Sequence, residues 1–367
     1  MKNLLKVTFV GMLLASPAFS GGWEASRLDS SMMYQDGSYA EVATSSADYD
    51  IKGTTQAGKK HKMAKDQTRT MLGFKMQYGN FDVGLTSYRS GAIQMDGANG
   101  HSAGCSLANL AACSVVPSAD VEVNSLALLG RYRINDNMSV LAGLNRYDVS
   151  NGKVTTLLGH YVVSGDEMAP IVGAAYENKE IALRAELVMQ IETDVALTAA
   201  SSTSPAVATS SVTGAKMVLP QTFTLNLQSG IAEDTLLFGS IHKADWKSAN
   251  IAIPANTVGP VSKTGSDFSN STAYSIGLGR KLTDNLSVLG SYSMEDGGGA
   301  TSTSSFTMTD GHQTLGLAAR YTTDNMTITG GYNYAKVGDV KVTSSGLTSD
   351  YKDNKVTGFG IKLGFSF

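Results

Sequence analysis

The side chains that could perform catalysis are few and scattered along the chain. The five histidines are His61, His101, His160, His242 and His312, and no Gly-x-Ser-x-Gly or His-Glu-x-x-His motif occurs. His242 and Asp245 share one strand end, but the sequence fixes no serine beside them, as a hydrolase requires. We therefore predict no catalytic residue, no cofactor and no enzymatic activity.

The two cysteines lie close together, in Cys105-Ser-Leu-Ala-Asn-Leu-Ala-Ala-Cys113. In an exported protein, such a pair most simply forms a disulfide that closes a small loop. A metal site is disfavoured because two thiolates need further ligands, and His101 is the one nearby candidate. The sequence predicts a disulfide between Cys105 and Cys113 and no metal.

Basic side chains recur on one face of the expected strands. This set comprises Arg69, Lys75, Arg131, Arg133, Arg184, Lys281, Arg320 and Lys362. Because arginine can grip a carboxylate through two hydrogen bonds, Arg131, Arg184 and Arg320 are candidates for binding an anionic headgroup. The alternative is that these cations pair with carboxylates of the same face, such as Glu186, Glu192 and Asp194, and fill the pore.

The elements that would position these residues are β-strands, as the last ten residues show. The odd positions of 358–367 are apolar and the even positions are small or polar, which gives a period of two. An apolar band opposite a small, polar face is typical of a strand that contacts lipid on one side. The chain also ends on an aromatic residue, Phe367, as outer-membrane barrel proteins commonly do.

Short turns and long polar connections alternate along the whole chain. The six short turns are at 79–80, 135–136, 178–179, 232–233, 283–284 and 323–324. The expected strands are 37–51, 66–78, 81–91, 120–134, 137–150, 166–177, 180–195, 216–231, 234–247, 267–282, 285–296, 310–322, 325–336 and 353–367. The sequence thus predicts an all-β fold, a 14-stranded antiparallel transmembrane β-barrel over 37–367, with both termini at the short-turn end. Tyr78, Tyr132, Tyr176, Tyr292, Tyr321, Tyr332 and Tyr334 suit an aromatic belt at the membrane interfaces.

The first 20 residues have the form of a secretory signal peptide. Lys2 and Lys6 precede a short apolar run, and Ala18-Phe19-Ser20 fits a cleavage site. Cleavage would leave 27 basic and 32 acidic residues, and this negative balance argues against nucleic acid as a partner. No other stretch approaches 18 consecutive apolar residues, which excludes a helical membrane protein.

The segment 21–36 is neither alternating nor strongly helical. We expect it to begin at the short-turn mouth of the barrel and to fold into the lumen as a plug. Its apolar members would be costly in water, and burial in the lumen removes that cost; they are Trp23, Leu28, Met32, Met33 and Tyr34.

Two blocks of the sequence resemble the long-chain fatty acid transporter family, which includes the toluene and aromatic-hydrocarbon transporters. They are the plug leading into the first strand, 26–41, and the central Leu219-Pro220-Gln221 block that continues to Trp246. The resemblance implies that an apolar ligand lands in a loop-lined groove, enters the lumen and leaves sideways through a kinked third strand. Here that strand is 81–91, where Gly84 and Gly91 permit a bulge, and Leu107 and Leu110 are candidate groove residues. The plug is shorter than the family's usual hatch and lacks its Asn-Pro-Ala signature.

The expected function is therefore passive uptake of hydrophobic small molecules, fatty acids or aromatic hydrocarbons, across the bacterial outer membrane. The expected partners are this ligand, outer-membrane lipid, lipopolysaccharide and the barrel-assembly machinery, and the barrel is expected to be a monomer. Two alternatives stay open. A general diffusion porin would have an open lumen, and a surface adhesin would bind through its long loops, 92–119 and 196–215 among them.

Overall fold

The computed structural model describes residues 22–157, 159–202, 210–249, 251–252, 267–344 and 346–367. The predicted signal peptide, 1–20, lies outside these residues. Within the described part, no helix is long and apolar enough to cross a membrane.

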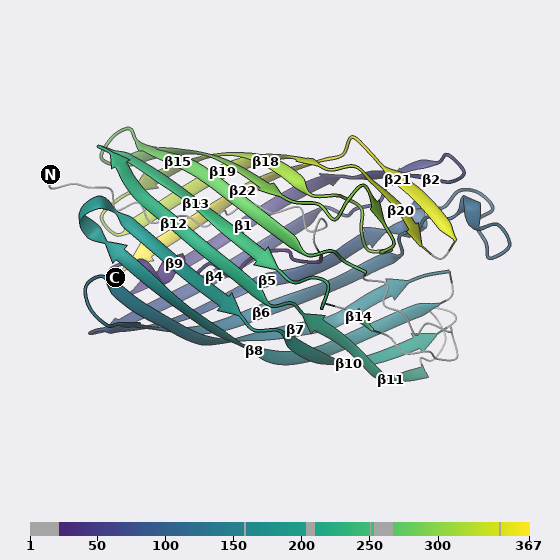
Figure 1. The fold of residues 1–367 in the computed structure, drawn as a ribbon, viewed down its shortest axis with the longest axis horizontal. Coiled ribbons are helices and arrows are strands. Elements are labelled where there is room, and N and C mark those ends of the chain that lie inside the picture. Colours follow the sequence, from purple (N-terminus) through teal and green to yellow (C-terminus); the bar gives the residue numbers. More distant parts are fainter. Residues whose placement is uncertain (1–21, 158, 203–209, 250, 253–266, 345) are drawn as a thin grey trace.

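The described chain forms one closed antiparallel β-barrel, in which β22 (Lys355–Ser366) pairs with β1 (Tyr39–Asp50) and with β19 (Met326–Val337) (Figure 1). The neighbouring strands that complete the wall follow in chain order: β4 (Gln67–Tyr78), β5 (Phe81–Asp96), β6 (Ser118–Arg133), β7 (Met138–Thr155), β8 (His160–Asn178), β9 (Leu183–Gln190), β10 (Thr193–Ser202), β11 (Ser210–Leu219), β12 (Thr222–Ala232), β13 (Thr235–Ala244), β14 (Ile251–Ala252), β15 (Ser271–Lys281), β16 (Leu286–Glu295) and β18 (His312–Thr322). When β9 with β10, β11 with β12 and β13 with β14 are each taken as one interrupted strand, the wall has 14 strands, as predicted.

The exterior of the barrel is apolar over a continuous band. On β22, Phe359, Ile361 and Phe365 are exposed, while Lys362 between them is buried inside. The seven tyrosines predicted for an interfacial belt are all exposed as well. A closed wall with this exterior pairs its backbone amides internally and presents hydrocarbon to lipid, which is the arrangement a membrane requires.

Glu192 and Asp194 were predicted to face the lumen, and this was wrong. Both are exposed on the outer face, because the strand is interrupted between Gln190 and Thr193. The neighbouring strand is interrupted at the same level, since Gln190 pairs with Thr222 and Thr193 pairs with Leu219. Pro220 lies at that second interruption and has no amide to donate to a ladder, so the alternation of faces changes there.

A second, smaller sheet covers part of the long-loop end of the barrel. It contains β2 (Lys52–Thr55), β3 (Lys60–Lys62), β17 (Thr301–Ser302), β20 (Val340–Ser344) and β21 (Leu347–Tyr351). In Figure 1, β2, β20 and β21 lie at the end opposite the C-terminus. The sequence predicts polar connections without strands over 52–65 and 337–352, so these hairpins were not expected.

Candidate functional site: a plugged lumen and a gap in its wall

The segment that precedes β1 lies inside the barrel. Its short helix η1 (Ser31–Tyr34) is buried, and the chain reaches the short-turn end at Ser38, whose backbone pairs with Phe367. The plug runs opposite to the expected direction, because Trp23 lies beside Gly91, on the long-loop half of β5. Trp23 packs there edge-on against Trp246, with 5.3 Å between the ring centroids, and both rings are buried.

Two methionines of the plug pack against the inner wall. Met32 and Met33 are fully buried in a cluster that includes Tyr88, Leu129 and Ile171, and Leu28 packs against the same cluster from the plug. Gly84 makes this approach possible, since a Cβ atom there would overlap the Met33 sulfur. Gly84 itself sits in a regular ladder, paired with Leu129 on β6, and carries no bulge.

The ring of Tyr34 is held between two of the predicted arginines. The guanidinium carbons of Arg131 and Arg184 lie 4.1 and 4.2 Å from the ring centroid, a cation–π arrangement. The Tyr34 hydroxyl donates to Glu186 at 2.8 Å, and Arg131 donates to the Met33 carbonyl oxygen at 2.9 Å. Arg320 is buried on β18, where it donates to Thr329 at 3.3 Å, and is not part of this group.

Ion pairs fasten the plug to the wall at two further points. The Lys362 Nζ atom lies 3.2 Å from Asp29 of the plug and 2.7 Å from Glu41 of β1. These contacts are largely excluded from solvent, because the Lys362 and Glu41 side chains are at most 5% exposed and Asp29 is 14% exposed. A buried charge that loses its partner is strongly destabilising. The contacts among Lys362, Asp29 and Glu41 therefore hold the plug against the wall at Asp29.

The second ionic point lies nearer the long-loop end. Arg27 pairs with Glu24 at 2.8 Å within the plug and with Glu295 of β16 at 3.4 Å. His242 of β13 lies 3.3 Å from Glu24 through its Nε2 atom. Glu24, Arg27 and Asp29 were not predicted to contact the wall, although the charges of a segment expected inside the lumen call for partners there.

The wall has a gap between β4 and β5. Their ladder runs from Tyr78 and Phe81 to Leu72 and Ser87, and the next backbone contact is the bridge between Ala64 and Met95 with the adjoining bond from Lys65 to Gln94. One side-chain bond crosses the space between them, from Arg89 to the Thr68 carbonyl oxygen at 3.2 Å. Between these points, residues 66–71 and 88–93 form no ladder pair with each other. Each strand keeps its other neighbour, β1 or β6, so the barrel stays closed elsewhere.

The gap coincides with a bulge in β5. The register with β6 shifts between Arg89 and Gly91, so Ser90 is the extra residue, and both Ser90 and Gly91 are buried. The plug pairs with β5 at this bulge through an antiparallel bridge between Glu24 and Gly91, in which Ala25 donates to Ser90 and Ala92 donates to Trp23. Arg69 of β4 donates to the Ala25 carbonyl oxygen. Gly91 admits the Trp23 ring, which a Cβ atom at that position would overlap.

A cavity of about 160 Å³ lies between the plug and the wall. Plug residues 25–31 line one side of it, and side chains of β9, β12, β13, β15 and β16 line the other. Thr70 and Arg89, from the two edges of the gap, also line it, so the cavity extends to the opening between β4 and β5.

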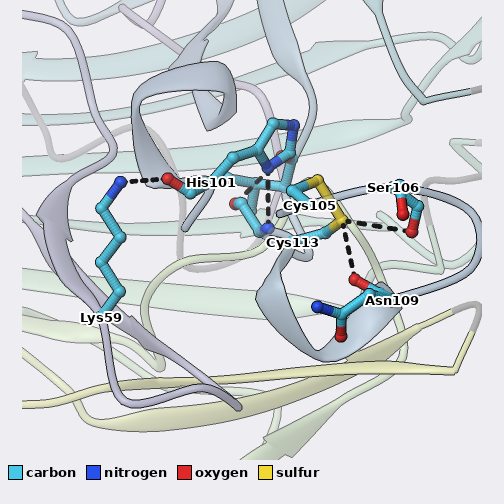
Figure 2. Close-up of a disulfide and its surroundings, with 8 residues drawn as sticks. Lys59, His101, Cys105, Ser106, Asn109 and Cys113 are labelled. Atoms are coloured by element: carbon cyan, nitrogen blue, oxygen red, sulfur yellow. Dashed lines mark hydrogen bonds between the residues drawn. A yellow bond between two sulfur atoms is a disulfide. The ribbon is translucent and has the colours of Figure 1, made fainter. Parts of the chain in front are cut away.

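The long loop between β5 and β6 contains the cysteines, which form a disulfide (Figure 2). The imidazole of His101 lies next to it and accepts a hydrogen bond from the Ser114 amide at 3.0 Å through Nδ1. Burial, and then the Lys59 ammonium, lower the pKa of His101, so the ring is neutral at pH 7 and able to accept. His101 and the two sulfurs converge within 4.8 Å, but the disulfide occupies both sulfurs and leaves a single ligand for a metal.

The two leucines predicted to line a groove are on the same loop. Leu107 is 64% exposed, whereas Leu110 is partly buried against the core of the long-loop end. Neither lines the cavity beside the plug.

Loss of the disulfide is expected to loosen this loop and leave the barrel intact. A cross-link that spans eight positions contributes about 2–3 kcal/mol by restricting the open chain. In the C105A/C113A variant, the amides of 98–117 should exchange with deuterium faster than in the wild type, with the exchange of β6 and β22 unchanged as an internal control. Unchanged exchange over 98–117 would show that packing alone orders the loop.

Solved structures of similar fold are known, although no family model and no curated protein matches the sequence. A FadL homologue from Pseudomonas aeruginosa superimposes with a TM-score of 0.70, at 14% identity, over 92% of each chain. The toluene transporter TodX of Pseudomonas putida gives a TM-score of 0.65 at 13% identity, over 96% of this chain and 98% of that one.

The toluene transporter TbuX of Ralstonia pickettii gives a TM-score of 0.63 at 11% identity, over 99% of this chain and all of that one. The chain has the FadL-type barrel fold. At these identities the likeness establishes the fold, and function has to be argued from the lumen and its plug.

Proposed function

We propose that this protein lies in the bacterial outer membrane and mediates passive uptake of hydrophobic small molecules. The observation that carries the proposal is the gap between β4 and β5, which lies where plug residues 23–25 cover the wall and where the lumen cavity reaches it. An apolar solute that left through the far end of the lumen would have to enter water, which is unfavourable. A side opening lets it pass from the cavity directly into the surrounding lipid.

The proposed path starts at the long-loop end, where Leu107 of the loop 97–117 is available to an arriving apolar molecule. The molecule then enters the cavity beside the plug. Displacement of residues 23–25 from β5 uncovers the gap at Ser90 and Gly91, and the molecule leaves between β4 and β5.

Arg184 is the residue best suited to hold the headgroup of an acidic ligand such as a fatty acid. It lines the cavity and is buried, and among the described residues no carboxylate lies within ion-pair distance of it. Arg131, by contrast, is already paired with Glu177 and with the plug backbone. Arg320 lies on another part of the wall and has no proposed ligand contact.

The protein is proposed to act as a monomer, in contact with lipid around its whole circumference, after insertion by the barrel-assembly machinery. Lipopolysaccharide is the proposed neighbour at the long-loop end. Lys62 and Lys65 there pair with Asp66 and Asp120, and the exposed Lys60 is the lysine proposed to meet its phosphates. TodX and TbuX are toluene transporters, which supports an apolar cargo here.

Uptake of labelled oleate and labelled toluene tests the proposal, in cells that lack their own transporter for each. The wild type should raise the uptake of at least one compound several-fold over cells without the protein. The same protein in planar bilayers should conduct few ions, whereas a variant lacking 23–35 should conduct strongly, because the plug fills the lumen. Large steady currents from the wild type would instead indicate a general porin, and no uptake of either compound would refute transport.

A further inference from the structure

One row of inward-facing polar side chains crosses neighbouring strands at a single level of the barrel wall. Each member is the direct ladder partner of the next, and the members are Glu186 on β9, Asn226 on β12, Ser240 on β13, Ser275 on β15, Ser293 on β16 and Thr314 on β18. All but Thr314 line the cavity beside the plug. We refer to these six residues as the polar row.

The polar row has hydrogen-bonding capacity to spare. Asn226 donates to Glu186 at 2.9 Å, and the hydroxyls of Ser240 and Ser275 lie 2.8 Å apart. A serine hydroxyl offers one donor and two acceptor positions, so this last contact leaves both serines able to bind another group. At the end of the row, Thr314 is 6% exposed and its hydroxyl has no hydrogen-bond partner among the described residues.

The opposite side of the same cavity offers an apolar patch, formed by Leu28 of the plug, Ala43 of β1, Met71 of β4 and the ring of Tyr88 on β5. Charged side chains of the same elements, Arg27, Arg69 and Arg89, lie beside this patch. The volume, about 160 Å³, is close to that of an engineered apolar cavity that holds one benzene molecule, about 150 Å³. The cavity therefore suits a single ring better than a long acyl chain.

A bare hydrocarbon ring in this cavity would cover the polar row without replacing the hydrogen bonds that water makes to it, which is unfavourable. A carboxylate bound to Arg184 would also lie beside the negative charge of Glu186, its neighbour on the same face of β9, so the polar row itself favours a neutral group. A neutral hydroxyl can both donate to and accept from the row, and it leaves the ring against Leu28 and Met71.

We propose that the cavity selects a single-ring aromatic molecule that carries a hydroxyl group, a phenol, with the hydroxyl on Ser240, Ser275 and Ser293 and the ring against the plug. This inference rests on the proposed uptake function and narrows its cargo.

The test compares p-cresol with p-xylene, which differ by a hydroxyl in place of a methyl group. Calorimetric titration of the detergent-solubilised full-length protein measures the dissociation constant of each compound. The wild type should bind p-cresol about tenfold more tightly, as one net buried hydrogen bond implies. In S240A/S275A/S293A this preference should fall to near parity. In S46A/S87A, which removes two serines exposed on the outer face, it should persist.

The wild-type comparison needs no variant, so the inference is testable even if the triple variant fails to fold, which circular dichroism would reveal. Equal or tighter binding of p-xylene by the wild type overturns the inference, as does an unchanged preference in the folded triple variant. If the protein binds and takes up oleate but binds neither aromatic compound, the inference is overturned while the proposed uptake function stands. Absence of binding and of uptake for all compounds overturns the proposed function as well.

Discussion

Planar bilayers that contain the K362M variant are expected to show large ion-conducting openings at least a hundredfold more often than bilayers with the wild type. Methionine removes the ammonium that lies 3.2 Å from Asp29 and 2.7 Å from Glu41, and it leaves two carboxylates in a site that is largely closed to solvent. Breaking a buried pair in this way costs about 3–5 kcal/mol, which corresponds to at least a hundredfold shift in population. The 14 paired strands remain, so the plug is the part that gives way.

Two controls separate plug release from a general effect of the mutation. Lys355 lies on the same strand but is exposed, so K355M should behave as the wild type does. The D29N/E41Q/K362M variant has no unpaired charge at the site, so its openings should be far rarer than those of K362M. Equal opening frequencies in K362M and the wild type would show that this trio does not retain the plug.

The barrel wall was predictable because its signals are local. Short turns such as 135–136 and 283–284, and the strict alternation of 358–367, depend on residues adjacent in sequence. The structure places strands within a few residues of most expected ranges, for example Met326–Val337 against 325–336. The change of faces at Glu192 was not predictable in this way. It depends on an interruption shared with the neighbouring strand at Pro220, and the sequence alone does not give the register between the two strands.

The plug contacts were less predictable because they join residues far apart in the chain. The apolar plug residues could be identified from their type, but not their partners: Gly91 for Trp23 and Gly84 for Met33. The sequence likewise placed Lys362 in the lumen, but its ion pair with Asp29 could be identified only from the folded structure. The polar row likewise becomes visible once the register places Ser240, Ser275 and Ser293 side by side.

If apolar molecules leave through the gap between β4 and β5, closing that gap should stop their uptake, and deletion of Ser90 is expected to close it. Ser90 is the extra residue of the bulge, so its removal lets Arg89 stay outside and Gly91 stay inside while β5 regains a regular register with β6. A regular β5 can extend its ladder to β4 and close the gap. S90A is the matched control, because it removes the hydroxyl and keeps the bulge.

The measurement is uptake, by cells producing each variant, of whichever labelled compound the wild type transports. Surface amounts are matched, and circular dichroism confirms a folded barrel. Side exit predicts that uptake by the Ser90 deletion falls to less than about a tenth of the wild-type rate, as a factor of ten corresponds to only about 1.4 kcal/mol, with S90A close to the wild type. Uptake by the folded deletion variant at the wild-type rate would refute side exit, because the molecule would then leave by another path.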